Sequence, residues 1–282
     1  MKFNEACVSF LDYIEVTKSN GTYRKEKSKT SGLASYFNDC DLNLIDKKKI
    51  IAFIRFKKEK NIKVSATTLN MYISTLKRII KYNTDRVLQF DKLPENSRIP
   101  RIIEQEIIDK VFFYYRNYSK YKESLRNLVL FKLLLDTGLR INEALNLKIN
   151  DISMEANTIH VKITKTKKER YVFFTNSTKE ILFRLITTHA IKDYIFISYK
   201  ARKRLTVDNV QNICFRLEEK LNLNLRIRPH KWRHTFATNF LKRGGDLESL
   251  RLILGHTSLK TTQKYLHLDK EFLHSEYFKT IE

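Results

Sequence analysis

The sequence predicts a mainly α-helical protein with a small antiparallel β-sheet, divided into two domains. Apolar residues recur at helical spacing through most of the 282 residues, and only the stretch 158–174 alternates in the manner of a strand pair. Two of the three prolines, Pro94 and Pro100, bracket a polar stretch between helical patterns, which is typical of an interdomain linker. We therefore expect a helical domain, a linker and a larger second domain, over 1–93, 94–100 and 101–282.

Composition and charge narrow the kind of protein. A hydrophobic content of 42% is sufficient for packed cores and excludes a disordered chain. The 54 lysines and arginines exceed the 31 acidic residues, and the net charge of +23 favours a polyanionic partner. No stretch approaches the roughly 18 apolar residues of a membrane span, and no signal peptide is evident, so we expect a cytoplasmic protein. Cys7, Cys40 and Cys214 lack metal-ligand spacing, so we expect reduced thiols and no metal site.

The first domain is predicted to contain helices over about 3–17, 22–38, 46–60 and 65–82. The last of them has a continuous apolar stripe, and Ser65 is its candidate N-cap. Basic side chains lie away from that stripe, and we interpret three of them as candidate contacts to a nucleic-acid backbone: Lys77, Arg78 and Lys81. For any single lysine, the alternative is ordinary solvated surface.

The second domain is predicted to be helical on both sides of one β-hairpin. Its first helices cover about 104–118, 122–136 and 140–148. The hairpin pairs strands near 158–163 and 170–174, and its loop carries a run of lysines. Helices resume over about 177–190, 206–222, 229–243, 246–254 and 258–266, with a last one near 269–280.

Two segments late in the chain carry side chains that suit phosphate binding. Pro229 is expected in the first turn of a helix, so His230 and Arg233 should project from one face near its electropositive N-terminus. Such a helix terminus is a typical anion site. Further on, Gly255 is expected to end a helix, which leaves His256 on the turn and a tyrosine, at position 265, on the next helix.

A third segment places Arg140 just after a glycine turn, at the start of a helix that also carries Glu143. Taken alone, these two residues predict an exposed ion pair worth about 0.3 kcal/mol. Tyr265 alone would be one of 14 tyrosines, and a His-x-x-Arg pair alone is common on solvated helices. Each segment therefore gains meaning only from the other two.

Together the segments supply the groups that break a phosphodiester. Arg140 and Arg233 can fork onto the two nonbridging oxygens and stabilise a five-coordinate phosphorus. The hydroxyl of Tyr265 can attack in line and form a phosphotyrosyl ester, which stores the energy of the broken bond. Attack releases a proton and the leaving 5′-oxygen requires one, which suits His230 and a hairpin lysine of lowered pKa, Lys165.

In combination these motifs resemble the tyrosine recombinase (phage integrase) family over nearly the whole chain. The matching elements are T-G-L-R-I-x-E, the hairpin T-K-T-K-K-E-R, H-x-x-R-H-T-F-A-T, L-G-H and a tyrosine nine residues after that last histidine. The resemblance implies a SAM-like helical core-binding domain followed by a catalytic domain. It also implies a catalytic set, supported by Glu143, that consists of Arg140, Lys165, His230, Arg233, His256 and Tyr265.

Two parts of this assignment stay open. Lys165 best fits the register of the hairpin motif, and its neighbours are interpreted as backbone phosphate contacts: Lys162, Lys167 and Lys168. For His234, which follows the second catalytic arginine directly, a place in the core is as well supported as a role at the phosphate.

The resemblance implies site-specific recombination of DNA without ATP, metal or another cofactor. Protomers would cut through 3′-phosphotyrosyl links and exchange strands through a Holliday junction, as a homotetramer on double-stranded DNA with paired inverted sites. A C-terminal helix near 271–278 would either dock on a neighbouring protomer or pack on its own domain. The compact chain leaves no room for an N-terminal arm-binding module, which favours an Xer-like or simple mobile-element recombinase that acts at the nucleoid.

Three alternatives follow from the same residues. A metal-dependent relaxase or nuclease also cuts DNA, but the sequence has no clustered histidine or carboxylate ligands. A DNA-binding protein could retain the fold without catalysis, although the full residue set argues against it. A type IB topoisomerase shares the phosphoryl chemistry, and the two-domain organisation favours recombination over it.

Overall fold

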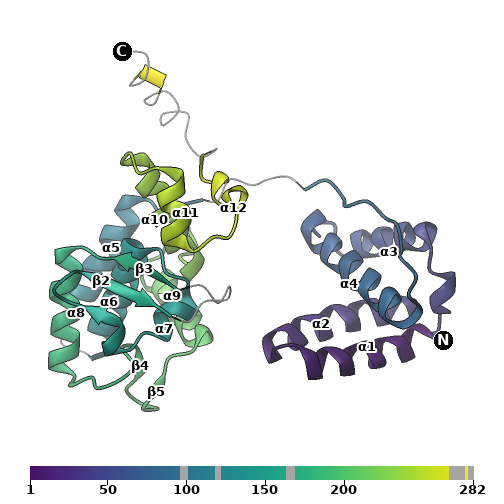
Figure 1. The fold of residues 1–282 in the computed structure, drawn as a ribbon, viewed down its shortest axis with the longest axis horizontal. Coiled ribbons are helices and arrows are strands. Elements are labelled where there is room, and N and C mark those ends of the chain that lie inside the picture. The colour runs from purple at the N-terminus through teal and green to yellow at the C-terminus, as the bar shows by residue number, and fades with distance from the viewer. Residues whose placement is uncertain (96–100, 118–121, 163–168, 267–276, 279–282) are drawn as a thin grey trace. The chain divides into compact units, whose positions relative to one another are not determined.

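The structure is a computed structural model that describes residues 1–95, 101–117, 122–162, 169–266 and 277–278. The chain divides into two compact units, Met1–Arg98 and Ile99–Glu282 (Figure 1). Within the described residues, helices predominate and the strands form small antiparallel sheets, which confirms the predicted fold class. No helix in these ranges is long and apolar enough to cross a membrane. Part of the predicted linker, most of the last predicted helix and three hairpin lysines lie outside the described residues: Lys165, Lys167 and Lys168.

In the described part of the first unit, four α-helices form the fold, and polar caps fix where three of them begin. They are α1 (Phe3–Thr17), α2 (Asn20–Phe37), α3 (Lys47–Lys60) and α4 (Ala66–Thr84). The side chains of Ser19, Asp46 and Ser65 accept hydrogen bonds from backbone N–H groups in the first turns of α2, α3 and α4. Ser65 is therefore the N-cap that the sequence predicts. The apolar faces of the helices meet in one core that includes Phe10 and Phe53.

The second unit is built around one buried helix. Its described helices are α5 (Gln105–Asn117), α6 (Lys122–Thr137), α7 (Ile141–Leu145), α8 (Asn176–Thr188), α9 (Val207–Lys220), α10 (Pro229–Lys242), α11 (Leu247–Leu254) and α12 (Leu259–Gln263). α6 packs against α5, α8 and α10, and its side chains are buried on most sides. A helix of that kind belongs in the middle of a domain core.

A small antiparallel sheet covers part of this helical core. Its strands, in spatial order, are β1 (Ile152–Ser153), β2 (Thr158–Val161) and β3 (Arg170–Phe173). β2 and β3 form the predicted hairpin, with buried Ile159 opposite buried Val172. The sequence does not predict β1, nor the second sheet in which β4 (Ile197–Ser198) pairs with β5 (Lys203–Arg204), because two-residue strands are too short to show alternation.

Trp232 fixes α10 against α6. Its fully buried ring stacks on Phe131 of α6 with a centroid distance of 5.0 Å, and its indole N–H donates to the carbonyl of Ile227 at 3.0 Å. Pro229 occupies the first turn of α10, as predicted, because the N–H that proline lacks has no helical partner there. Since Arg233 follows Trp232 directly, the packing of the tryptophan helps to set the direction of the arginine.

Two helices end earlier than the sequence predicts. α7 ends at Leu145. The backbone N–H of Ile149, directly after the predicted range, instead bonds the carbonyl of Asp193. α12 ends at Gln263. The prediction that Tyr265 lies on that helix is therefore wrong, because Tyr265 lies in the turn that follows it.

Candidate active site

Arg140 and Glu143 form an ion pair at the start of α7 whose carboxylate is buried, whereas the sequence alone predicts an exposed pair. The Glu143 side chain is 4% exposed, and its carboxylate accepts hydrogen bonds at 2.9 Å from both the backbone N–H and the guanidinium Nη1 of Arg140. Burial acts to raise the pKa of Glu143, but the hydrogen bonds and charge of Arg170, together with the hydrogen bonds of Arg140, outweigh it and lower that pKa. The carboxylate is therefore ionised and holds the Arg140 guanidinium in one direction.

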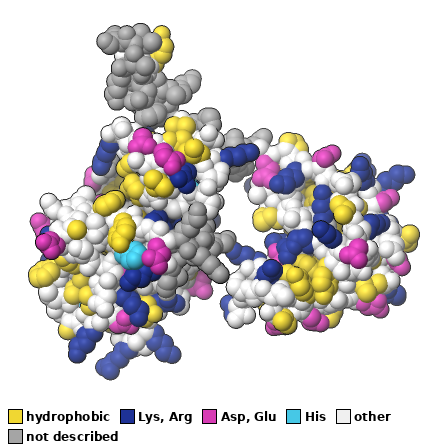
Figure 2. All heavy atoms as spheres, in the orientation of Figure 1, with side chains coloured by type: hydrophobic (Ala, Val, Ile, Leu, Met, Phe, Trp, Pro, Cys, Tyr) yellow, Lys and Arg dark blue, Asp and Glu magenta, His cyan; other side chains and the backbone are white. Residues whose placement is uncertain are grey.

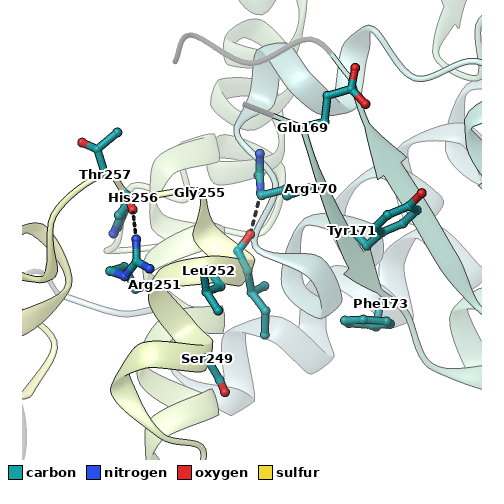
Figure 3. Close-up of a pocket in the computed structure, with 11 residues that line it drawn as sticks. Glu169, Arg170, Tyr171, Phe173, Ser249, Arg251, Leu252, Gly255, His256 and Thr257 are labelled. Carbon is teal, nitrogen blue, oxygen red and sulfur yellow. Dashed lines mark hydrogen bonds between the residues drawn. The ribbon is translucent and has the colours of Figure 1, made fainter. Parts of the chain in front are cut away.

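Arg170, the first residue of β3, is the second partner of Glu143. Its Nη1 and Nη2 donate to the two carboxylate oxygens at 3.1 and 2.7 Å. Its Nε donates to the carbonyl of Ile253 in α11 at 2.7 Å, and Figure 3 shows the side chain reaching from the strand to that helix. Arg170 thereby ties α7, β3 and α11 together.

Arg233 lies against the same end of α11. The residue is 5% exposed, and its guanidinium donates to the carbonyls of Gly138 at 2.6 Å and Leu254 at 2.7 Å. The Nη2 of Arg140 donates to the carbonyl of Gly255 at 3.2 Å. Two guanidinium groups from distant parts of the chain thus bond consecutive carbonyls at the C-terminal end of α11, where the helix dipole is negative.

His256 follows Gly255 directly and contacts Arg233. Its Nε2 lies 3.0 Å from the Nη2 of Arg233, and its Nδ1 lies 2.9 Å from the Oγ1 of Thr262. Because a guanidinium only donates, Nε2 accepts, and the proton of the neutral ring is on Nδ1, which donates to Thr262. Burial and the charges of Arg233 and Arg140 lower the pKa of His256 to about 3, so the ring is neutral at pH 7.

Tyr265 lies beside these groups with its hydroxyl buried. The residue is 3% exposed, and its Oη is 2.8 Å from the Nδ1 of His234 on α10. Burial raises the pKa of Tyr265 to about 12, against the opposing effect of the charges of Arg233 and Arg140. Because His234 follows Arg233 directly on α10, its contact with the hydroxyl brings Tyr265 to the arginine pair, and the three predicted residues lie in one site.

His230 belongs to the same cluster. It lies in the first turn of α10, where burial, followed by the charges of Arg233, Lys264 and Arg140, lowers its pKa. Lys264 in turn places its Nζ 4.9 Å from the ring centroid of Tyr265. The cluster is thus strongly cationic, and His230 within it is neutral and able to accept a proton at pH 7.

A pocket of about 450 Å³ adjoins the cluster, with β3 on one side and α11 on the other (Figure 3). Arg170 and His256 line it together with the exposed apolar side chains of Tyr171, Phe173 and Leu252. The two arginines that bond consecutive carbonyls are not among its lining residues. The pocket is therefore a neighbour of the arginine pair and does not contain it.

The three basic residues of α4 that the sequence suggests as nucleic-acid contacts differ from one another in their surroundings. Arg78 pairs with the buried carboxylate of Glu26 at 3.1 Å, and Lys77 donates to the carbonyl of Phe90 at 2.6 Å. Lys81 is exposed. On the face drawn in Figure 2, lysine and arginine side chains gather on both units. Two of the three candidates thus have internal partners, and Lys81 is directed to solvent.

In the hairpin, Lys162 pairs with Asp151 at 2.8 Å. The other predicted hairpin residues lie outside the described part of the chain: Lys165, Lys167 and Lys168. The structure therefore locates five of the six predicted catalytic residues in one cluster and leaves the place of the hairpin lysine as a prediction.

Sequence reasoning did not find two contacts of this cluster and left a third open. Arg170 ends the hairpin motif, which is a signal, but its partner Glu143 lies 27 residues away. Thr262 carries no signal in the sequence, since hydroxyl residues are common in the first turns of helices. His234 contacts the tyrosine, 31 residues away, a partner that neither interpretation of the sequence named.

Known proteins resemble this chain in sequence and fold. The phage integrase family model matches residues 102–271. The chain is 34% identical to tyrosine recombinase XerA of Saccharolobus solfataricus over 219 residues, covering 78% of this chain and 69% of that protein. It is 31% identical to tyrosine recombinase XerC of Bacillus subtilis over 230 residues, covering 76% and 74%. The fold matches the Tn1549 transposon integrase in complex with transposon right-end DNA, with a TM-score of 0.81, 17% identity and full coverage of both chains.

Proposed function

The chain belongs to the phage integrase family and is a tyrosine-type site-specific DNA recombinase, and on this premise we propose how its residues cut DNA. Tyr265 is the nucleophile, and Arg140 and Arg233 bind the phosphate that it attacks. The observation that carries this proposal is the bonding of both guanidinium groups to the consecutive carbonyls of Leu254 and Gly255, while His234, the residue after Arg233, contacts the Tyr265 hydroxyl. One protomer then supplies both the phosphate clamp and the nucleophile.

Cleavage is an in-line exchange at phosphorus. The Tyr265 oxygen bonds to phosphorus while the bond from phosphorus to the 5′-oxygen breaks, which leaves the 3′-phosphate joined to the tyrosine. The arginine pair stabilises the added negative charge of the five-coordinate state. His256 stays neutral, and its Nε2 accepts a hydrogen bond from Arg233, which helps to hold that guanidinium at the phosphate.

Two protons move during this exchange. The tyrosine hydroxyl loses one and the leaving 5′-oxygen gains one, and the proposed acid–base groups are His230 and Lys165. The lowered pKa of His230 keeps its ring neutral and ready to accept a proton at pH 7. In strand joining, the steps run in reverse, with the 5′-hydroxyl of a partner duplex as the nucleophile.

The substrate proposed is double-stranded DNA with paired inverted sites, bound by a homotetramer that passes through a Holliday junction. The net charge of +23 supports a polyanionic partner. Structures of similar fold are complexes with DNA: XerH is bound to a palindromic difH substrate, and lambda integrase is a dimer on a core site. We place the link between protomers in the C-terminal segment near 271–278, of which the structure describes only residues 277–278.

Covalent trapping tests the nucleophile. The probes are duplexes that the protein enriches from a random-sequence pool, remade with a nick so that the released strand diffuses away. In EDTA, the wild type should form a protein–DNA adduct linked through the 3′-phosphate, and Tyr265→Phe should form none. Tyr82→Phe, which alters an exposed tyrosine of α4, is the matched control and should react like the wild type. An adduct that persists in Tyr265→Phe would overturn the assignment.

A further inference from the structure

The hydrogen bond between His234 and Tyr265 lies outside the catalytic set that the family resemblance implies. It joins the imidazole Nδ1 to the tyrosine Oη at 2.8 Å. We infer that His234 is a positioning residue for the nucleophile, which accepts the hydroxyl hydrogen and so directs an oxygen lone pair toward the phosphate. This inference rests on the proposed role of Tyr265.

The direction of this hydrogen bond follows from the chemistry of the two groups. A phenol is a stronger acid than a neutral imidazole, and an imidazole nitrogen is a stronger base than a phenol oxygen, so O–H···N is favoured over N–H···O. Burial and the charges of Lys264, His230 and Arg233 lower the pKa of His234 to about 4. The pKa of Tyr265 is about 12, so the proton stays on the oxygen and both groups are neutral. In the free protein His234 therefore orients the hydroxyl and does not deprotonate it.

Other restraints on Tyr265 do not orient its oxygen. The residue lies beyond the short helix α12, and its backbone N–H bonds the carbonyl of Thr262 at 2.9 Å. Its ring packs in a small apolar cluster with Phe236 and Leu250, and Lys264 lies over it. These contacts fix where the ring lies, but rotation of the O–H about its bond to the ring is restrained by hydrogen bonding. Among the described residues, His234 is the only hydrogen-bond partner of this hydroxyl.

Adjacent residues of α10 are assigned to the two reacting groups, the phosphate and the nucleophile. Arg233 lies on the phosphate side, next to the carbonyl of Leu254, and His234 holds the nucleophile. Trp232 anchors the same turn of the helix in the core. One rigid segment of three residues therefore sets the separation of nucleophile and phosphate. A misplacement of about 1 Å in such a geometry costs about 100-fold in rate.

Two substitutions at position 234 test this inference on the full chain. His234→Leu removes the acceptor, whereas His234→Asn keeps an acceptor oxygen near the place of Nδ1 without a group that titrates. We expect adduct formation on the nicked duplex to slow about 100-fold in His234→Leu and to stay within about threefold of the wild type in His234→Asn. DNA affinity should be unchanged in both. His189→Asn, which alters a partly buried histidine at the end of α8, is the control and should react normally.

A second measurement requires neither DNA nor activity. In protein with ¹⁵N-labelled histidine, the Nδ1 resonance of His234 should report an unprotonated, hydrogen-bonded nitrogen at pH 7 and should shift in Tyr265→Phe. An unshifted resonance, or a wild-type rate in His234→Leu, would contradict the positioning role. If His234→Asn were as slow as His234→Leu, the imidazole would be the proton acceptor itself, and the inference would be wrong. Failure of the proposed nucleophile is a separate result, namely an adduct that persists in Tyr265→Phe.

Discussion

Arg140 and Arg233 donate hydrogen bonds to consecutive carbonyl oxygens, those of Gly255 at 3.2 Å and Leu254 at 2.7 Å. The two cations belong to segments almost a hundred residues apart, and the end of α11 is the template that brings them together. The negative end of the helix dipole offsets part of their mutual repulsion. The arrangement of the phosphate clamp therefore depends on the backbone geometry of one helix terminus.

Gly255→Ala should disturb that terminus. Gly255 has a φ of +64°, and an added Cβ would lie 3.1 Å from the side chain of Arg170. We expect a loss of about 1–2 kcal/mol in the free energy of unfolding, measured in urea, because both the backbone and Arg170 must shift. Gly21→Ala, in α2 with nothing within 4 Å of the new Cβ, is the control and should be as stable as the wild type or more stable. Equal losses in the two variants would contradict this explanation.

Glu143→Gln should be strongly destabilising. The carboxylate is buried between the guanidinium groups of Arg140 and Arg170, and the amide cannot balance two cations. Removing one partner of a buried ion pair costs about 3–5 kcal/mol, so we expect a loss in that range at pH 7 by denaturant unfolding.

The effect of Glu143→Gln should also depend on pH. The folded-state pKa of Glu143 is lower than its ordinary value of 4.5. Its ionised form therefore contributes stability that is complete above about pH 4.5 and is lost as the pH falls through the folded-state pKa. The difference between wild type and variant should shrink below pH 4.5, and a constant difference down to pH 3 would show that the charge of Glu143 is not what stabilises the fold.

Local signals in the sequence predict most of the helices, because several of them carry a cap, a proline or a glycine at an end. Ser65 and Pro229 begin α4 and α10 where the sequence places them, and Gly255 ends α11. The strands β4 and β5 escape prediction, because two residues carry no periodicity. Longer elements can therefore be predicted from local sequence patterns, whereas strands of two residues form only through tertiary contacts.

The candidate site divides in the same way. The catalytic residues carry motif signals, so Arg233 and Tyr265 are found from the sequence. Their partners are set by tertiary geometry: the Arg140–Glu143 pair is recognisable at i, i+3 spacing, but its burial and its sharing with Arg170 are not. No rule of spacing could have paired His234 with a tyrosine 31 residues away in a turn.

Thr262→Val should slow cleavage while the fold is retained. The Oγ1 of Thr262 accepts the Nδ1–H of His256, and valine has the same shape without an acceptor. The lost hydrogen bond is worth about 1–1.5 kcal/mol, which corresponds to about a tenfold slower adduct formation on the nicked duplex. Thr238→Val is the matched control, since Thr238 is also buried but its Oγ1 has no hydrogen-bond partner among the described residues. The two variants should differ in rate, and similar rates would remove Thr262 from the site.

The neutral histidines His234 and His256 should make stability fall in mild acid. Their folded-state pKa values are about 4 and about 3, whereas the ordinary value is 6.5. As the pH falls from 6.5 toward 4, the unfolded chain binds protons that the folded chain does not, so the free energy of unfolding decreases. The Glu143 carboxylate stays ionised above pH 4.5, so the window from 6.5 to 4.5 isolates the histidines. Melting temperatures should fall more steeply with decreasing pH in the wild type than in the double variant His234→Asn/His256→Asn, whereas parallel curves would mean that these rings titrate normally.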